Sequence, residues 1–171
     1  ARCGANVVLL GRDTAKTTKV RDGIALRTGN PSLTVVTADM GDLDDVRRVA
    51  AEIIDRCPRL DVLVHNAGAL TADRRESAQG IEQTVASQVV GPFLLTSLLL
   101  PLLRASAPAR VLTVSSGGMY AAALTVDGLQ MGDDYAGSEQ YARAKRAQVT
   151  LNEMWSQRVP AEEIVFHAMH P

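Results

Sequence analysis

The chain has 171 residues, a length typical of one domain, and 46% hydrophobic and 22% charged residues, a composition typical of a globular protein. Its 18 basic and 19 acidic residues give a net charge of −1, which offers no electrostatic basis for binding nucleic acid or an anionic membrane. The two cysteines, Cys3 and Cys57, lie outside any CxxC pair. The composition therefore argues against a disulfide scaffold and a zinc module, and it predicts no metal site.

Short apolar runs alternate with longer helical patterns along the whole chain. The runs expected to form strands are Asn6–Leu10, Leu33–Thr37, Asp61–His65, Arg110–Val114 and Ile164–His167. The segments expected to form helices are Thr14–Arg27, Leu43–Arg56, Ile81–Ala105 and Ser138–Val159, with Asp42 and Ser138 as N-caps. The apolar runs are continuous, which is typical of parallel strands covered on both faces. This alternation predicts the α/β class, with a doubly wound parallel sheet in a single domain over residues 1–171.

The longest apolar stretch, Val89–Leu103, is interrupted by Pro92 and Pro101. A membrane-spanning helix needs about 20 largely apolar residues, so we expect a buried helix and no membrane partner. No basic segment followed by an apolar one opens the chain, and we expect a cytoplasmic protein. Because the chain starts at Ala1 and ends at Pro171 just after an apolar run, we expect both ends to have been cut from a longer protein.

Small or polar residues follow each predicted strand. They are Gly11-Arg12-Asp13, Ala38-Asp39-Met40, Asn66-Ala67-Gly68, Ser115-Ser116-Gly117-Gly118 and His170-Pro171. In open parallel sheets, ligands bind outside the carboxyl ends of the strands, so these segments are candidates for a site. The longest irregular segment is residues 116–137. We expect it to be functional, because long loops inside compact domains usually are.

Tyr141 and Lys145 stand four residues apart in a predicted helix, which places them on one helix face. A phenol with a pKa of about 10 is a poor acid–base catalyst near neutrality. A neighbouring ammonium favours the phenolate and lowers the pKa of a phenol. The pair therefore predicts a general acid/base centre, with a surface tyrosine and a solvated lysine as the alternative.

The order of these motifs resembles the short-chain dehydrogenase/reductase family. Asn66-Ala67-Gly68 follows one strand, Ser115-Ser116 the next, and Tyr-x-x-x-Lys then opens a helix. Residues 115–119, 127–130 and 141–148 further resemble the branch of proteins similar to dehydrogenase/reductase family member twelve. The resemblance implies a Rossmann-like fold and an NAD(P)-dependent oxidoreductase that interconverts an alcohol with a ketone or an aldehyde.

The resemblance also assigns catalytic roles. Tyr141 would be the general acid/base, Lys145 would support it and hold the nicotinamide ribose, and Ser116 would bond the substrate oxygen while Ser115 stays structural. Gln88 stands where the family usually places an asparagine as its fourth catalytic residue. Gln88 keeps the amide and lengthens the side chain by one methylene, so the sequence leaves its part in a water-mediated proton relay open.

The cofactor-binding residues implied by the family are distributed along the chain. Asn66, Ala67 and Gly68 would line the adenosine side, Asp39 and the Met40 backbone would contact adenine, and Pro171 would begin the turn over the nicotinamide. Arg12 follows the strand after which a carboxylate normally holds the ribose of NAD. A guanidinium can grip a 2′-phosphate in a fork, so we expect NADP in preference to NAD.

Residues 1–171 depart from the family in a second respect, besides Gln88. The glycine-rich phosphate turn and the first strand, which would lie mid-sheet between the strands beginning at Asn6 and Asp61, would precede Ala1. We therefore expect a truncated domain. The family often forms homo-oligomers through the helices that carry Gln88 and Tyr141, and the sequence leaves the oligomeric state open.

Two other functions stay open at this point. A non-catalytic dinucleotide-binding sensor or scaffold is disfavoured by the intact set of Ser116, Tyr141 and Lys145, because a sensor needs no proton donor. A sugar-nucleotide epimerase or dehydratase is disfavoured by Asn66-Ala67-Gly68. The expected partner is a small alcohol or carbonyl substrate.

Overall fold

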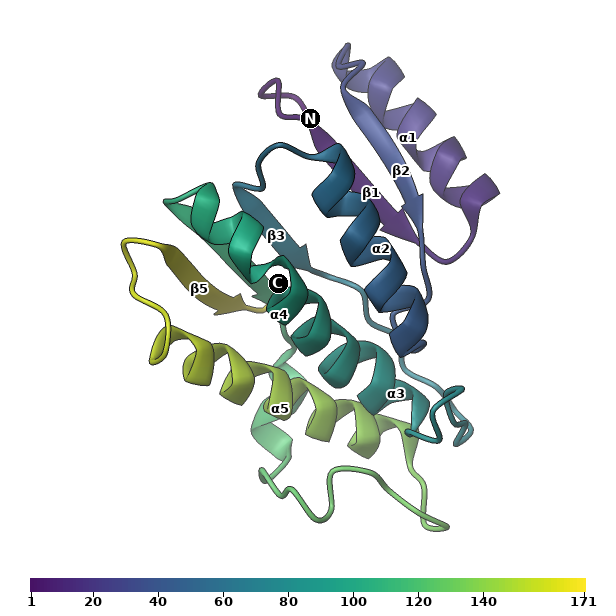
Figure 1. Ribbon diagram of the computed structural model, residues 1–171. Coiled ribbons are helices and arrows are strands. Elements are labelled where there is room, and N and C mark those ends of the chain that lie inside the picture. The colour runs from purple at the N-terminus through teal and green to yellow at the C-terminus, as the bar shows by residue number, and fades with distance from the viewer. The chain divides into compact units, whose positions relative to one another are not determined.

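The computed structural model describes residues 1–171 as strands and helices in alternating order (Figure 1). The chain divides into two compact units, residues 1–39 and residues 40–171, which are described separately below. The first unit contains β1 (Val7–Gly11), α1 (Thr14–Thr28) and β2 (Leu33–Thr37). The second contains α2 (Leu43–Arg56), β3 (Val62–His65), α3 (Gln83–Val85), α4 (Gly91–Ala105), β4 (Ala109–Val114), α5 (Gly137–Ser156) and β5 (Ile164–Met169).

In the first unit, β1 and β2 are parallel and α1 connects them. The strand register runs from Val7 opposite Leu33 to Gly11 opposite Thr37. The carboxylate of Asp13 caps α1 by accepting the N–H of Lys16 at 2.9 Å, and Gly29 ends the helix at a φ of 68°, which favours glycine. Arg12 lies between β1 and this cap with its side chain exposed.

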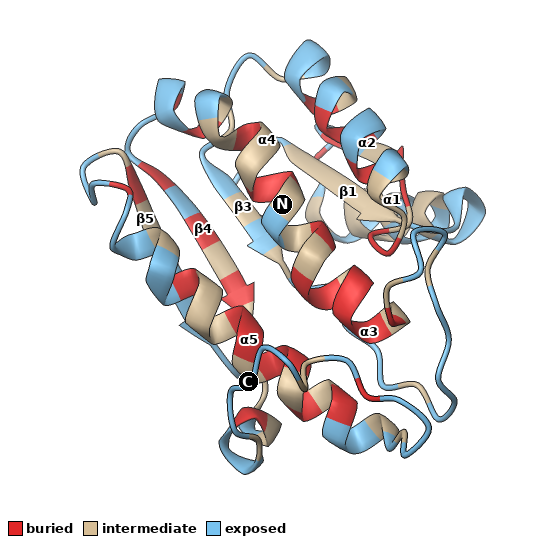
Figure 2. Ribbon diagram, turned by 60° about the horizontal axis from the view of Figure 1, so that its bottom comes forward, coloured by how far each residue is buried: buried red, intermediate tan, exposed pale blue.

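In the second unit, β3, β4 and β5 form a parallel sheet in that order. Helices α4 and α5 cover one face, where Val111 and Phe166 are buried (Figure 2). Val62 and Val64 of β3 are 42% and 51% exposed. The prediction that every strand is covered on both faces is therefore wrong for β3, because its alternate residues point away from these two helices.

The core of the second unit lies between α2, α4, α5 and the sheet. Helix α2 buries Val46, Val49, Ala50 and Ile53 on one face, as its apolar spacing predicts. Gly91 lets α4 approach the loop before α2 closely: a Cβ at this position would lie 3.1 Å from the Met40 carbonyl carbon and closer still to its oxygen. Gly91 thus allows close packing between the start of α4 and this loop.

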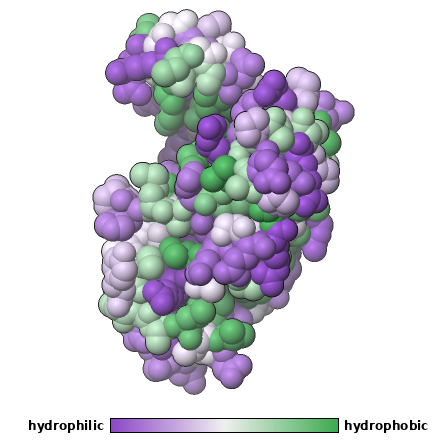
Figure 3. Space-filling view, turned by 90° about the vertical axis from the view of Figure 1, so that its left-hand side faces the viewer, coloured by the Kyte–Doolittle hydropathy of each residue, from purple (hydrophilic) through white to green (hydrophobic).

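The predicted helix Ile81–Ala105 is built from three pieces. Glu82 caps α3, residues Ala86–Val90 form a π-helical turn, and α4 follows. This stretch, Gln83–Ala105, is the one helix long and apolar enough to cross a membrane by length and composition, and half of its apolar window is buried within the molecule. Leu95, Leu99 and Leu103 are buried, a pattern that the core helix of a folded domain also gives. On the face drawn in Figure 3, apolar and hydrophilic residues are interspersed.

One of the two predicted helix caps is confirmed and the other is wrong. Asp42 caps α2 by accepting the N–H of Asp44. Helix α5 begins at Gly137 rather than after Ser138, and its N-cap, Ala136, makes no side-chain bond. A Cβ on Gly137 would lie 3.0 Å from the Thr71 carbonyl carbon. The helix therefore begins at a position where only glycine fits against the loop that follows β3 and contains Thr71.

The alternation of parallel strands with helices confirms the predicted α/β, Rossmann-like fold. The strands form two sheets. In the first, β1 pairs with β2, and in the second, β3 is an edge strand that pairs with β4.

Candidate active site

Tyr141 and Lys145 occupy one face of α5, as their spacing predicts. The Lys145 Nζ lies 5.4 Å from the centroid of the Tyr141 ring. Nζ donates to the carbonyl of Val114, at the carboxyl end of β4, at 3.0 Å. Lys145 is only 2% exposed, and burial lowers the pKa of its ammonium. The structure thus holds a buried cation against a phenol at the edge of the sheet where the sequence placed a site.

The two serines after β4 have different surroundings. Ser115 is buried, and its hydroxyl donates to the Lys145 carbonyl at 3.3 Å while its N–H donates to Met169. Ser116 is half-buried, and its Oγ accepts the N–H of Gly118 at 3.3 Å at the start of a 3-10 helix, Gly117–Ala121. Because a hydroxyl also has one proton to donate, Ser116 can still bond an oxygen of a ligand. The structural role expected for Ser115 fits its contacts.

Gly68 lies where the loop after β3 meets the Lys145 side chain of α5. A Cβ on Gly68 would lie 3.2 Å from Oε1 of Gln88 and 3.3 Å from Nζ of Lys145. Both polar atoms therefore lie on the side of Gly68 where a side chain would collide with them, so glycine is the residue that fits here.

Gln88 is buried in the π-helical turn, 2% exposed. Its side-chain Nε2 donates to the carbonyl of Ala69 at 2.7 Å, and its Oε1 has no partner although it is buried. A buried polar atom without a partner costs about 1–3 kcal/mol, so such an atom in a folded protein calls for an explanation. Short π-helical turns occur frequently at functional sites.

A groove of about 460 Å³ lies beside this centre, a volume within the range of small-molecule sites. Its walls are the 3-10 helix and the first turns of α5, and the lining residues are Gly118, Ala121, Ala122, Ala123, Thr125, Ser138, Glu139, Ala142 and Arg143. Gly118 also adjoins the Ser116 hydroxyl. The groove therefore begins next to the residue expected to bond the substrate oxygen.

The remaining predicted residues lie outside this cluster. Arg12 and Asp39 belong to the first unit. Met40 is buried with its carbonyl against Gly91, and the backbone of Asn66 and Ala67 is exposed after β3. Pro171 is exposed at the end of the chain. Their roles toward a cofactor stay predictions.

His65, at the end of β3, has the contacts of a structural residue. Its Nε2 lies 2.7 Å from the Thr96 hydroxyl, and burial lowers its pKa to about 4. The imidazole is therefore neutral at pH 7. No group of three or more His, Cys, Asp or Glu side chains in residues 1–171 is arranged to hold a metal ion.

The sequence analysis missed several buried polar residues that hold the site together. Glu82 is fully buried and accepts the N–H groups of Thr84 and Val85, while the Tyr135 hydroxyl donates to it at 3.4 Å. Gln140 bonds the backbone of Leu129 and Met131 and so ties the loop before α5 to that helix. The sequence offers a signal for Glu82, which is an acidic residue just before an apolar helix. It offers no local signal that Gln140 and Gln148 are buried and bonded.

Comparisons with known proteins cover the whole chain. A family model described as short chain dehydrogenase matches residues 1–171. Human dehydrogenase/reductase SDR family member 12 is 35% identical over 100% of this chain and 53% of its own length. Human retinol dehydrogenase 13 is 32% identical over 100% of this chain and 52% of its own length. The chain spans about half the length of the curated relatives it matches.

Solved structures give the same result. A crystal structure of a protein from Mycobacterium paratuberculosis has a TM-score of 0.84 and 30% identity, with 100% of this chain and 60% of that one covered. The RhlG/NADP active-site complex from Pseudomonas aeruginosa has a TM-score of 0.78 and 27% identity, with 99% and 63% covered.

Proposed function

Because this chain belongs to the short-chain dehydrogenase family, we propose that it forms the catalytic part of an NAD(P)-dependent oxidoreductase that interconverts an alcohol with a ketone or an aldehyde. The observation that carries the proposal is the buried Lys145 ammonium, 5.4 Å from the Tyr141 ring on the same helix. A positive charge this close favours the phenolate, which a lone tyrosine does not form readily near neutrality.

Each side chain at this edge of the sheet has a different role in the proposed reaction. Tyr141 gives a proton to the carbonyl oxygen during reduction and takes one from the hydroxyl during oxidation. Lys145 stabilises the deprotonated phenol, and the Ser116 hydroxyl donates to the substrate oxygen from the mouth of the adjoining groove. The nicotinamide, when bound, supplies or accepts the hydride. The groups around Lys145 are neutral, so its positive charge acts on the phenol of Tyr141.

The chain also carries residues that would hold the cofactor. The exposed backbone of Asn66–Gly68 and the Lys145 ammonium suit a ribose, and Asp39, Met40 and Pro171 keep the roles that the family resemblance gives them. NADP is the proposed cofactor because the Arg12 side chain is exposed while Asp13 is engaged as the cap of α1. The NADP named for the Pseudomonas aeruginosa relative supports this choice.

The test uses the longer protein that we expect to contain this chain. Tyr141→Phe removes one oxygen and little volume, so we expect kcat to fall by about 10²–10⁴-fold with dinucleotide affinity within about twofold of the parent. Lys145→Ala should lower both. Tyr120→Phe is the matched control, since Tyr120 is 75% exposed and should keep parental kinetics.

Two outcomes would count against the proposal. A Tyr141→Phe variant with the parental rate would remove Tyr141 from the reaction. A parent protein that binds a dinucleotide but turns over no alcohol or carbonyl compound would favour the sensor alternative.

A further inference from the structure

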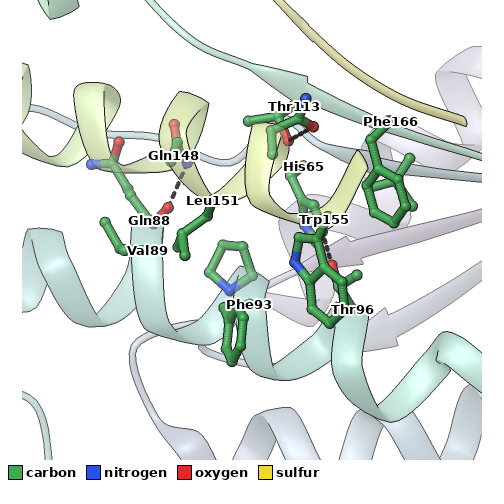
Figure 4. A pocket seen from close by; sticks show the side chains of 13 residues that line it. His65, Gln88, Val89, Phe93, Thr96, Thr113, Gln148, Leu151, Trp155 and Phe166 are labelled. Atoms are coloured by element: carbon green, nitrogen blue, oxygen red, sulfur yellow. Dashed lines mark hydrogen bonds between the residues drawn. The ribbon is translucent and has the colours of Figure 1, made fainter. Parts of the chain in front are cut away.

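The backbone carbonyl of Gln88 cannot accept the hydrogen bond that an α-helix would normally give it. In an α-helix this carbonyl would accept the N–H of residue 92, but residue 92 is proline and has none. The chain here widens into the π-helical turn, in which the Gly91 N–H bonds the Ala86 carbonyl. The side-chain amide of Gln148, on α5, donates to the Gln88 carbonyl (Figure 4). Gln148 thus supplies a donor that Pro92 cannot.

The opposite end of Gln88 faces the catalytic lysine. Its Nε2 donates to the carbonyl of Ala69. Its unpartnered Oε1 lies on the same side of Gly68 as Lys145 Nζ, since a Cβ on Gly68 would come 3.2 Å from the oxygen and 3.3 Å from the nitrogen. The direction of this side chain depends on where its backbone is held. A small shift of the turn would therefore move the amide oxygen away from the ammonium.

Gln148 itself lies away from the reacting groups. It lines a cavity of about 30 Å³ between α4, α5 and the sheet, together with His65 and Thr96 (Figure 4). Asn152 lines the same cavity. A cavity of this size holds about one water and is far below the several hundred Å³ of a ligand pocket. Gln148 is 5% exposed, so it reaches the chemistry only through Gln88.

We propose that Gln148 is a positioning residue, which fixes the Gln88 backbone and thereby keeps the Gln88 amide oxygen near the Lys145 ammonium. The inference rests on the proposed function. An amide oxygen favours a nearby positive charge, whereas burial opposes it. When that oxygen is displaced, the ammonium supports the phenolate less well.

The other neighbours of Lys145 do not replace this contribution. From its own helix Tyr141 faces it, from β4 the Val114 carbonyl, and from the loop after β3 the backbone of Gly68. Burial alone shifts its pKa, with no contribution from a charged group. The titratable group nearest to Gln148 across the cavity, His65, is neutral above about pH 4.

The experiment compares Gln148→Met and Gln148→Leu in the longer protein with the matched control Asn152→Leu. Both Gln148 variants keep an apolar side chain of similar volume and remove the donor. Asn152 lines the same cavity one turn along the same helix and bonds Thr113 rather than Gln88. The readout is the pH dependence of kcat/KM for alcohol oxidation, which requires the phenolate, together with the dissociation constant for NADPH.

In both Gln148 variants we expect the acidic limb of this profile to move up by about half a unit to one unit, with the dissociation constant within about twofold of the parent. Asn152→Leu should leave the limb in place, whatever it does to the melting temperature. An active parent whose acidic limb is the same in both Gln148 variants overturns the inference alone. A parent without dinucleotide-dependent turnover overturns the proposed function, and the inference with it.

Discussion

Replacing Gly91 by alanine tests the close approach of α4 to the loop before α2. Gly91 is the first residue of α4. A Cβ there would lie 3.1 Å from both the Met40 carbonyl carbon and the Ala86 carbonyl oxygen, and closer still to the Met40 oxygen. Backbone cannot rotate away as a side chain can, so the helix must shift. Overpacking costs about 1–3 kcal/mol, and because the contacted atoms are backbone the cost here is at the upper end, about 2–3 kcal/mol. About 1 kcal/mol is gained from helix propensity.

Gly23→Ala is the matched control, because Gly23 lies inside α1 with no atom within 4 Å of a new Cβ. That variant should gain about 0.4–1 kcal/mol in stability, whereas Gly91→Ala should lose about 1–2 kcal/mol net. Urea unfolding of the longer protein, followed by circular dichroism, measures both. A Gly91→Ala variant as stable as the parent would refute the close contact with Met40.

Two other predictions concern the cofactor and the isolated chain. Arg12→Ala should weaken NADPH binding about tenfold or more and leave NADH binding nearly unchanged, as titrations of both nucleotides would show; a parent that prefers NADH, with the same preference in the variant, contradicts the choice of NADP. Residues 1–171 expressed alone should lack activity and a cooperative melt, because β1 and β3 each have an unpaired edge and Val62 and Val64 are exposed. A cooperative thermal transition with micromolar NADPH binding would show that the unpaired edges are tolerated.

The elements and the approach of Tyr141 to Lys145 could be predicted from the sequence because both depend on local spacing. Leu33–Thr37 and Leu43–Arg56 were predicted with the bounds that the structure shows. Tyr141 and Lys145 meet because residues four apart share a helix face. Asp42 was identified as a cap from its position alone. In each case the physical cause lies within a few residues of the effect.

The contacts that hold Gln88 could not be predicted in the same way. Pro92, four residues after Gln88, indicates that one carbonyl lacks its helical donor, and this much is local. That the donor is Gln148, 60 residues further along, depends on how α4 and α5 pack on the sheet. Gly137 was missed as the start of α5 for the same reason, since the requirement for glycine comes from Thr71 in another loop.

The two most buried charges of the second unit are stabilised by backbone dipoles. Lys145 forms no ion pair and bonds the Val114 carbonyl at the end of β4. Glu82 accepts two N–H groups at the start of α3, where the helix dipole favours a carboxylate. An acidic partner for Lys145 would have stabilised the ammonium but cancelled much of its field at the phenol. The Val114 carbonyl stabilises the same ammonium without a net opposite charge, so its field remains available to Tyr141.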